Sequence, residues 1–323
     1  MFPLTEFPVY AAESTYQFAN PLAVEFGMWG FLVWALYFLT TFYFCAIEPK
    51  LALFEIPAVK FVNNGIIIAT CAFTGFLFLS YLPSYIEGIS TAAQYGLVAV
   101  VVLSAVLSST DVKYVKILSI ASVWLFFALI AFLWVDSDMG ARGFLGSAAN
   151  LGDYFVNLHR FVAPMSDYHA FYLFWWFAWS IMIGQFVARF LSPMKTRNLL
   201  ITLLVIPSIP IAVWFSVLYY YHAYALELSD TVKFCLITVG VVFVINSLDS
   251  LIRLYTVNLG TTVDKLGRGN YIVFNALAMF TLIMLYQFTP FEIQWVGLTV
   301  IALYCVIYVL LYRRRAILLG HTS

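Results

Sequence analysis

Nine long apolar runs dominate the sequence and constrain its fold more than any other feature. A helix needs about 20 mostly apolar residues to cross the hydrocarbon core of a bilayer. The runs are residues 23–47, 63–82, 92–107, 117–135, 168–190, 199–221, 232–248, 271–286 and 291–312. Asp111, Lys113 and Lys116 mark the end of the third run, and SLDS at 247–250 is expected to interrupt the seventh. The sequence therefore predicts an all-α membrane protein with nine transmembrane helices.

The composition agrees with a chain that lies in a bilayer. Hydrophobic residues make up 63% of it and charged residues only 10%, far below the roughly 25% charged residues of soluble domains. Lys plus Arg and Asp plus Glu both number 16, so the net charge indicates no nucleic-acid partner. The four cysteines have neither metal-ligand spacing nor the pattern of a disulfide framework. We therefore expect the lipid bilayer as the environment, and neither a metal nor a cofactor.

The distribution of Lys and Arg predicts the orientation in the membrane. With nine spans, one side collects thirteen basic residues: Lys50, Lys60, Lys113, Lys116, Arg189, Lys195, Arg197, Arg253, Lys265, Arg268, Arg313, Arg314 and Arg315. The other side has only Arg142, Arg160 and Lys233. Because basic residues accumulate in cytoplasmic loops, we expect the C-terminus in the cytoplasm, or on the matrix side in an organelle. The N-terminus is expected outside.

The spans divide the chain into five regions. These are an external segment (1–22), four helices (23–135), an external loop (136–167), five helices (168–312) and a cytoplasmic tail (313–323). The external loop is far longer than ordinary connections. Within it Leu151, Tyr154, Phe155 and Leu158 recur at helical spacing. We expect one amphipathic helix there, lying on the membrane surface over the outer face of the bundle.

Two groups of aromatic residues lie inside apolar runs. The first, in WWFAWSIMIG, is Trp175, Trp176 and Trp179. The second, in GMWGFLVWALYF, is Trp29, Trp34 and Tyr37. One interpretation is an interfacial belt, where most Trp and Tyr of membrane proteins occur, although the second group extends over two helical turns, deeper than a belt requires. The other interpretation is a cage, because aromatic faces attract a quaternary ammonium group through cation–π interactions.

At these residues the chain resembles the betaine/choline/carnitine transporter family. WWFAWSIMIGQFVARFLSPMKTR is similar to the family's signature helix, which has WW, two residues, WS, then a Gly, an AR pair and a basic loop. The matching positions are Trp175, Trp176, Trp179, Ser180, Gly184, Ala188, Arg189, Thr196 and Arg197. Trp29, Trp34 and Tyr37 resemble the rest of the family's aromatic box, which lies on its fourth helix. LGDYFVNL, VWFSVLYY and VFVINSLDS are similar to its surface helix, ninth helix and tenth helix.

The resemblance implies the family's five-helix inverted-repeat (LeuT-like) bundle, shortened at its N-terminus. The family has twelve spanning helices, and this sequence begins just before the fourth. The family's third helix is unwound and contributes backbone to the substrate and sodium sites, as discontinuous helices do in such transporters. Because lipid cannot satisfy exposed polar groups, we expect a partner membrane chain over the truncated face, which is formed by Trp29, Trp34, Trp176 and Asn246.

Asn246 and Ser247 stand where the family has a Thr-Ser pair whose hydroxyls help to coordinate sodium. The side-chain carbonyl oxygen of Asn can coordinate a cation, so this pair is the candidate ion site. In the alternative interpretation, Asn246, Ser247 and Asp249 only satisfy a helix break inside the bundle. Asp249 would then pair with Arg253, one helical turn on.

Two functions remain open. The sequence has no catalytic motif and no pair of titratable residues at one depth, so we do not expect an enzyme. In the first function, the chain is the larger part of a secondary transporter for quaternary ammonium compounds. Its ligand would be a trimethylammonium compound such as betaine, choline or carnitine, bound by Trp29, Trp34, Tyr37, Trp175, Trp176 and Trp179. In the second, the chain is a degenerate transporter homologue that serves as a structural subunit of a larger membrane complex.

Overall fold

Helices form all the regular structure of the residues that the computed structural model describes, 2–191 and 193–318. Nine helical segments in this part of the chain are long and apolar enough to span a membrane. They are α2 to α4 (Pro21–Leu51), α5 (Pro57–Tyr85), α6 (Thr91–Ser109), α7 (Val112–Asp136), α10 (Asp167–Phe190), α11 with α12 (Thr196–Ala223), α13 (Asp230–Leu259), α15 (Arg268–Phe288) and α16 (Ile293–Arg313). The prediction of an all-α, nine-span, integral membrane protein is therefore confirmed.

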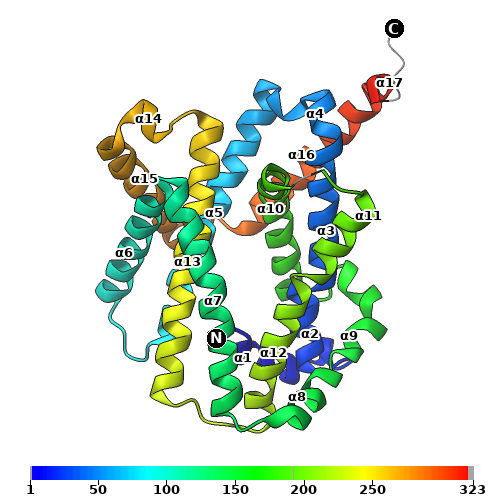
Figure 1. The fold of residues 1–323 in the computed structure, drawn as a ribbon, viewed down its shortest axis with the longest axis vertical. Helices are drawn as coiled ribbons and strands as arrows, with labels where there is room; N and C mark the ends of the chain where they lie inside the picture. The colour runs from blue at the N-terminus through cyan, green and yellow to red at the C-terminus, as the bar shows by residue number, and fades with distance from the viewer. Residues whose placement is uncertain (1, 192, 319–323) are drawn as a thin grey trace.

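The bundle has two distinct ends, which are the bottom and the top of Figure 1. The first, called here the α1/α8 end, carries three short helices: α1 (Phe2–Ala12), α8 (Gly140–Ala149) and α9 (Gly152–Val156). The second, the α4/α17 end, carries α4 (Glu48–Leu51), α14 (Val263–Leu266) and α17 (Arg315–Leu318). The helices α1 and α17, which are the first and the last, thus lie at opposite ends, as an odd number of spans requires.

The first span is not one regular helix. α2 (Pro21–Trp29) stops at Gly30, and α3 (Phe31–Phe42) continues into a π-helical turn, Tyr43–Ile47, before α4. A Cβ atom at Gly30 would lie only 2.7 Å from the carbonyl oxygen of Phe26. Glycine is therefore required at this break, which re-aims the side chains of α3 relative to those of α2.

The expected interruption of the seventh span at SLDS is wrong, because α13 runs without a break from Asp230 to Leu259. Two polar side chains in and beside this stretch, Asp249 and Asn246, accept hydrogen bonds from neighbouring helices. Ser108 of α6 donates a hydrogen bond to Asp249 (2.5 Å), and Ser119 of α7 donates one to Asn246 (2.8 Å). The expected ion pair between Asp249 and Arg253 is also wrong, since the one salt bridge found in residues 2–191 and 193–318 joins Lys60 and Glu55.

The external loop forms three short pieces where one amphipathic helix was expected. α8 and α9 are followed by a 3₁₀ turn, Leu158–Val162. Tyr154 is fully buried and packs edge-to-face on Phe26 at 5.1 Å, whereas Phe155 is 55% exposed. Tyr154 thus contacts the bundle as expected, but the helix is divided after Ala149 and again after Val156. The consequence is a cap over the α1/α8 end that is anchored by Tyr154.

Candidate functional site

Two helices bring the aromatic groups of the sequence together. α10 packs against α3, and the approach is close because a Cβ atom at Gly184 would lie 2.9 Å from the backbone carbonyl carbon of Thr40. As a result, one cluster contains all six predicted residues: Trp29, Trp34, Tyr37, Trp175, Trp176 and Trp179. We call these six residues the aromatic cluster.

Two pairs of rings within the aromatic cluster are in direct edge-to-face contact. Trp29 lies 5.0 Å from Trp175 between ring centroids, with an interplanar angle of 84°, and Trp34 lies 5.3 Å from Tyr37 at 86°. Trp176 and Tyr37 are 4% and 7% exposed, so both face the bundle interior and not the lipid interface. The edge-to-face geometry of the two pairs is the favoured one for aromatic rings.

Several indole N–H donors of the cluster are buried without an acceptor. In the described part of the chain, Nε1 of Trp34, Trp175, Trp176 and Trp179 makes no hydrogen bond. Tryptophan N–H groups usually find a partner when they are buried. The cluster therefore combines π-faces that attract a cation with free donors that fit a hydroxyl, carboxylate or water oxygen.

Trp179 lines a pocket of about 180 Å³ together with the predicted ion pair, Asn246 and Ser247. The sequence did not predict this proximity. Oδ1 of Asn246 already accepts a hydrogen bond from Ser119. Two side-chain oxygens, one of them engaged, fall short of the shell that a cation needs. A cation here would require further oxygen atoms from the backbone or from another chain.

Two buried acidic residues beside the aromatic cluster were not predicted from the sequence. Glu25 of α2 is fully buried, and its Oε2 accepts a hydrogen bond from the hydroxyl of Tyr10 at 2.8 Å. Glu6 of α1 is 6% exposed and accepts a hydrogen bond from Tyr168. The signal that could have indicated Glu25 was an acidic residue within an apolar run, one helical turn before Trp29, because such residues are expensive in a membrane and commonly functional.

Glu6 makes the stability of the protein depend on pH. Burial raises the pKa of its carboxyl group above the usual 4.5, although the hydrogen bond from Tyr168 opposes this shift. The folded state therefore binds the proton more tightly than the unfolded state, and stability falls as pH rises above about 4.5. We expect Glu6→Gln to remove this loss, with a melting temperature on the order of 2 °C above wild type at pH 8 and no gain at pH 4. Thermal unfolding of the detergent-solubilised protein checks this, and Glu87→Gln, an exposed site, should melt like wild type at both pH values.

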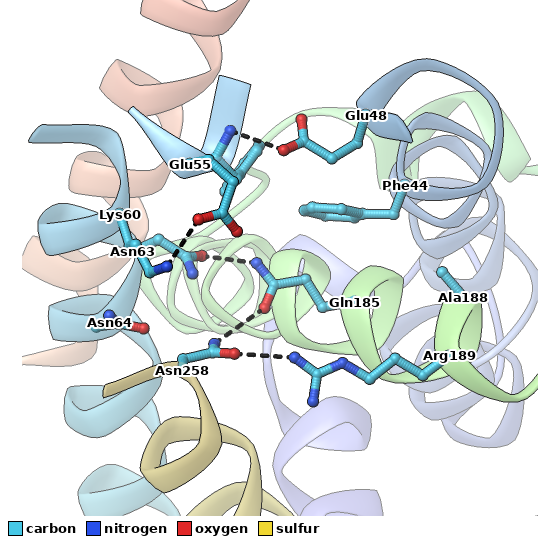
Figure 2. Close-up of a pocket in the computed structure, with 11 residues that line it drawn as sticks. Phe44, Glu48, Glu55, Lys60, Asn63, Asn64, Gln185, Ala188, Arg189 and Asn258 are labelled. Carbon is cyan, nitrogen blue, oxygen red and sulfur yellow. Dashed lines mark hydrogen bonds and ion pairs between the residues drawn. The ribbon is translucent and has the colours of Figure 1, made fainter. Parts of the chain in front are cut away.

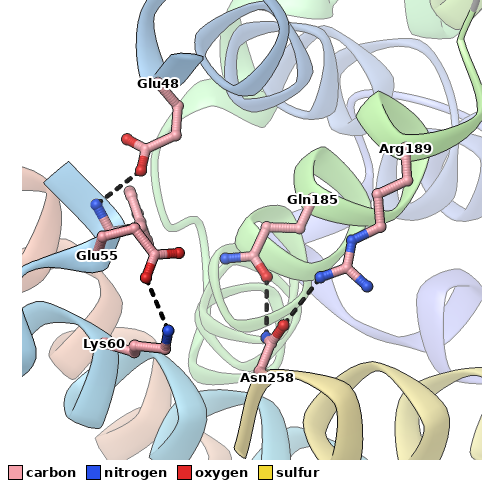
Figure 3. A network of polar contacts seen from close by, with 7 residues as sticks. Glu48, Glu55, Lys60, Gln185, Arg189 and Asn258 are labelled. Atoms are coloured by element: carbon pink, nitrogen blue, oxygen red, sulfur yellow. Dashed lines mark hydrogen bonds and ion pairs between the residues drawn. The ribbon is translucent and has the colours of Figure 1, made fainter. Parts of the chain in front are cut away.

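A second pocket, of about 280 Å³, lies toward the α4/α17 end and is lined mainly by polar residues (Figure 2). Gln185 donates a hydrogen bond to Asn63 (3.1 Å) and accepts one from Asn258 (3.4 Å). Arg189 donates to the same Asn258 at 2.8 Å. Figure 3 shows the contacts of Asn258 with Gln185 and Arg189 beside the ion pair of Lys60 with Glu55. We call Asn63, Gln185, Arg189 and Asn258 the amide network.

The amide network ties three transmembrane helices together. Asn63 lies on α5, Gln185 and Arg189 on α10, and Asn258 on α13. Arg189 and Gln185 share one face of α10, one helical turn apart. The network therefore holds α10, the helix of the WWFAWS motif, against α5 and α13 at the α4/α17 end.

Comparison with known proteins identifies relatives of this chain. The profile of the betaine/carnitine/choline family of transporters matches residues 65–222. The high-affinity choline transport protein of Escherichia coli (strain K12) is 33% identical over 166 residues, which are 46% of this chain and 24% of that protein. An uncharacterised transporter of Haemophilus influenzae is 33% identical over 143 residues, 40% of this chain and 21% of its own length. A glycine betaine/proline/choline/ectoine transporter of Vibrio parahaemolyticus is 30% identical over 118 residues, 32% of this chain and 19% of its own length.

The match covers only part of the candidate site. The alignments with these relatives span less than a quarter of the relatives' own length. The family profile includes Trp175, Trp176 and Trp179, whereas Trp29, Trp34 and the other residues of α2 and α3 precede it. The packing of α3 on α10, and not the match itself, joins the two halves of the aromatic cluster.

Proposed function

Because the chain belongs to the betaine/carnitine/choline family of transporters, we propose that it forms the larger part of a secondary transporter for quaternary ammonium compounds. The observation that carries this proposal is the packing of six buried or partly buried aromatic side chains, from α2, α3 and α10, in one cluster. A trimethylammonium group donates no conventional hydrogen bond and is attracted by aromatic faces. Betaine, choline and carnitine are therefore the proposed class of ligand.

We assign distinct positions to the six aromatic residues. Trp29, Trp34, Tyr37 and Trp176 form the cage around the ammonium group, and Trp175 supports Trp29 by its edge-to-face contact. Trp179 is the next tryptophan along the same helix and lines the pocket with Asn246. It therefore lies on the route from the cage toward the α4/α17 end. Entry of a ligand between the rings requires the pairs that touch in this structure, Trp29 with Trp175 and Trp34 with Tyr37, to move apart.

We also propose that this structure is closed at both ends of the route. The cap formed by α1, α8 and α9 covers the α1/α8 end, which the charge distribution places outside. The amide network holds the α4/α17 end, which would face the cytoplasm, and Gln185 links α10 to both α5 and α13 there. Alternating access in such bundles moves one group of helices against another, so opening this end would break the amide network.

Equilibrium binding of radiolabelled choline and glycine betaine to the native assembly in membrane vesicles tests the proposed function. Saturable binding of either ligand that unlabelled ligand displaces is the expected result. Absence of binding of both ligands would remove the transporter proposal. The chain would then be assigned to the alternative function, a structural subunit of a larger membrane complex.

A groove between α7, α10 and α13 indicates where a partner chain binds. The pocket that Asn246 lines adjoins a third pocket, of about 720 Å³. Both of these pockets are lined by Ser119, Phe186, Ser250 and Leu254. Hydroxyl and amide groups in such a groove are poorly satisfied by lipid. We propose that a transmembrane helix of a partner chain occupies the groove and completes the site, and that any ion at Asn246 depends on oxygens of that helix.

Photo-crosslinking tests the partner helix. A benzophenone side chain at Phe186 is expected to crosslink to another membrane protein, and the complex purified in mild detergent should exceed the 36.6 kDa of this chain. The same group at Trp124, a side chain on α7 that is 71% exposed, is expected to face lipid and to give no specific crosslink. A homogeneous 36.6 kDa monomer without a crosslink at Phe186 would contradict the proposal.

A further inference from the structure

Glu25 and Glu6 form an acidic site that adjoins the aromatic cluster. Tyr10 and Tyr168 join the two carboxylates, because Tyr10 donates to Glu25, Tyr168 donates to Glu6, and the two rings are 6.2 Å apart. Tyr168 also stacks edge-to-face on Tyr172 at 5.2 Å. Tyr172 in turn lies 5.6 Å from Trp29, so the acidic site and the aromatic cluster are continuous.

The carboxylate of Glu25 is only half satisfied. Its Oε2 has the hydrogen bond from Tyr10, but its Oε1 makes no hydrogen bond of regular geometry in the described chain, although the indole of Trp29 lies near it. Glu25 and Trp29 are four residues apart on α2, so their side chains share one face of the helix. Oε1 of Glu25 is therefore at the edge of the aromatic cluster, beside the indole of Trp29.

The described residues supply no positive charge to this site. Neither Glu25 nor Glu6 takes part in a salt bridge there. The described side chains that act electrostatically on Glu25 are acids or phenols: Glu6 and Tyr10 on α1, Tyr81 and Tyr85 on α5, and Tyr172 on α10. A buried carboxylate without a cation is so costly that it takes up a proton instead. A bound cation would serve in place of that proton.

We propose that Glu25 is the counter-charge for the ligand of the aromatic cluster, so that the site selects a net-cationic quaternary ammonium compound, such as choline, over a zwitterion such as glycine betaine. This inference rests on the proposed function. When the cation binds, the carboxyl group of Glu25 releases its proton to solvent, and the charge of the buried site is unchanged. The carboxylate of a zwitterion would face Glu25 and Glu6 and be repelled by both.

The neighbouring donors fit the rest of a choline-like ligand. Its hydroxyl group can donate to Oε1 of Glu25 and accept from one of the free indole N–H groups, such as that of Trp176. The indole N–H of Trp176 would then have an acceptor, and Oε1 of Glu25 would have a hydrogen bond of regular geometry. In this arrangement the aromatic cage binds the ammonium group of the ligand, and the acidic site binds its hydroxyl group.

Competition binding over a range of pH tests the inference. Radiolabelled choline and glycine betaine are titrated onto the native assembly in vesicles, from about pH 5.5 to about pH 8.5. We expect choline to bind more tightly than betaine, and its affinity to rise by up to about tenfold per pH unit on the acidic side, because one proton is released. Betaine affinity is expected to show no such rise. Choline addition should also acidify a weakly buffered suspension.

Two variants assign this behaviour to Glu25. Glu25→Gln keeps the size and an acceptor for Tyr10, and we expect it to weaken choline binding by about tenfold or more and to remove the pH dependence, with betaine binding retained. Tyr10→Phe keeps the carboxylate but removes its donor, so the midpoint of the choline pH profile should move to higher pH. Glu87→Gln, at an exposed site beyond the end of α5, is the matched control and should behave as wild type.

The outcomes separate this inference from the proposed function. Betaine binding as tight as choline binding, or a choline affinity that does not change with pH in wild type, would overturn the role of Glu25 and leave the transporter proposal intact. An unchanged pH profile in Tyr10→Phe would overturn it as well, even if Glu25→Gln fails to fold. Absence of binding of both ligands to the wild-type assembly would overturn the inference together with the proposed function.

Discussion

Trp176→Leu is expected to weaken the binding of choline and glycine betaine by the native assembly by roughly 2- to 30-fold or more. Trp176 is 4% exposed, on the buried side of α10, and packs near Tyr172. Each cation–π contact contributes about 0.5 to 2 kcal/mol, depending on desolvation. A ligand with millimolar to micromolar affinity has only about 4.1 to 8.2 kcal/mol in total. Loss of one buried contact therefore lowers the affinity by roughly 2- to 30-fold, and the unfilled volume beside the cage weakens the remaining contacts further.

Equilibrium binding of the radiolabelled ligands is the measurement, because it does not depend on tryptophan fluorescence. Trp124→Leu is the matched control, since Trp124 lies on α7 with 71% of its surface exposed. It should bind as wild type does. Equal affinities of wild type and Trp176→Leu would remove the aromatic cage from the proposed function, and absence of binding in both would favour the structural-subunit alternative.

Gly184→Val is expected to destabilise the bundle and to disrupt the aromatic cluster at the same time. The added Cβ atom would lie 2.9 Å from the backbone carbonyl carbon of Thr40 and 3.0 Å from the ring of Phe44. Backbone cannot move aside as a flexible side chain can, so α3 must shift away from α10. Overpacking of this kind costs about 1 to 3 kcal/mol, and it displaces Trp34 and Tyr37 relative to Trp176.

Thermal unfolding and ligand binding together check this prediction. The melting temperature of Gly184→Val should fall by several degrees, and ligand binding should be lost at temperatures where the variant is still folded. Gly96→Val is the control, because Gly96 lies inside α6 and a Cβ atom there meets nothing within 4 Å. Equal melting temperatures of the two variants would show that α3 and α10 tolerate separation at Gly184.

The nine-span architecture and the aromatic motifs were predictable from the sequence. The apolar length that spans a bilayer is a local property, and it is read from about 20 consecutive residues. The spacing of Trp175, Trp176 and Trp179 likewise assigns them to two faces of one helix before any packing is known. For these reasons the predicted spans correspond to helices of the structure, whose ends extend a few residues further at most termini.

The wrong predictions, a helix break at SLDS and an ion pair of Asp249 with Arg253, concern polar residues inside the spans. They were wrong because the hydrogen-bond partners of such residues lie on other helices. SLDS was expected to break the seventh span, but Ser108 on α6 satisfies Asp249 across the helix interface. An amide network joins Asn63, Gln185 and Asn258, which are separated by more than 70 positions from one to the next. No local pattern indicates contacts of this kind.

The closeness of α3 to α10 was decided by the tertiary structure alone. The sequence contains the two aromatic groups but not their distance, which depends on a glycine at 184 facing the backbone of Thr40. The pairing of Glu25 with Tyr10 depends in the same way on α1 folding back onto α2. Hydropathy determines which residues enter the membrane, whereas side-chain volume and hydrogen bonding between helices determine which of them meet. The aromatic cluster and its acidic neighbours belong to the second category.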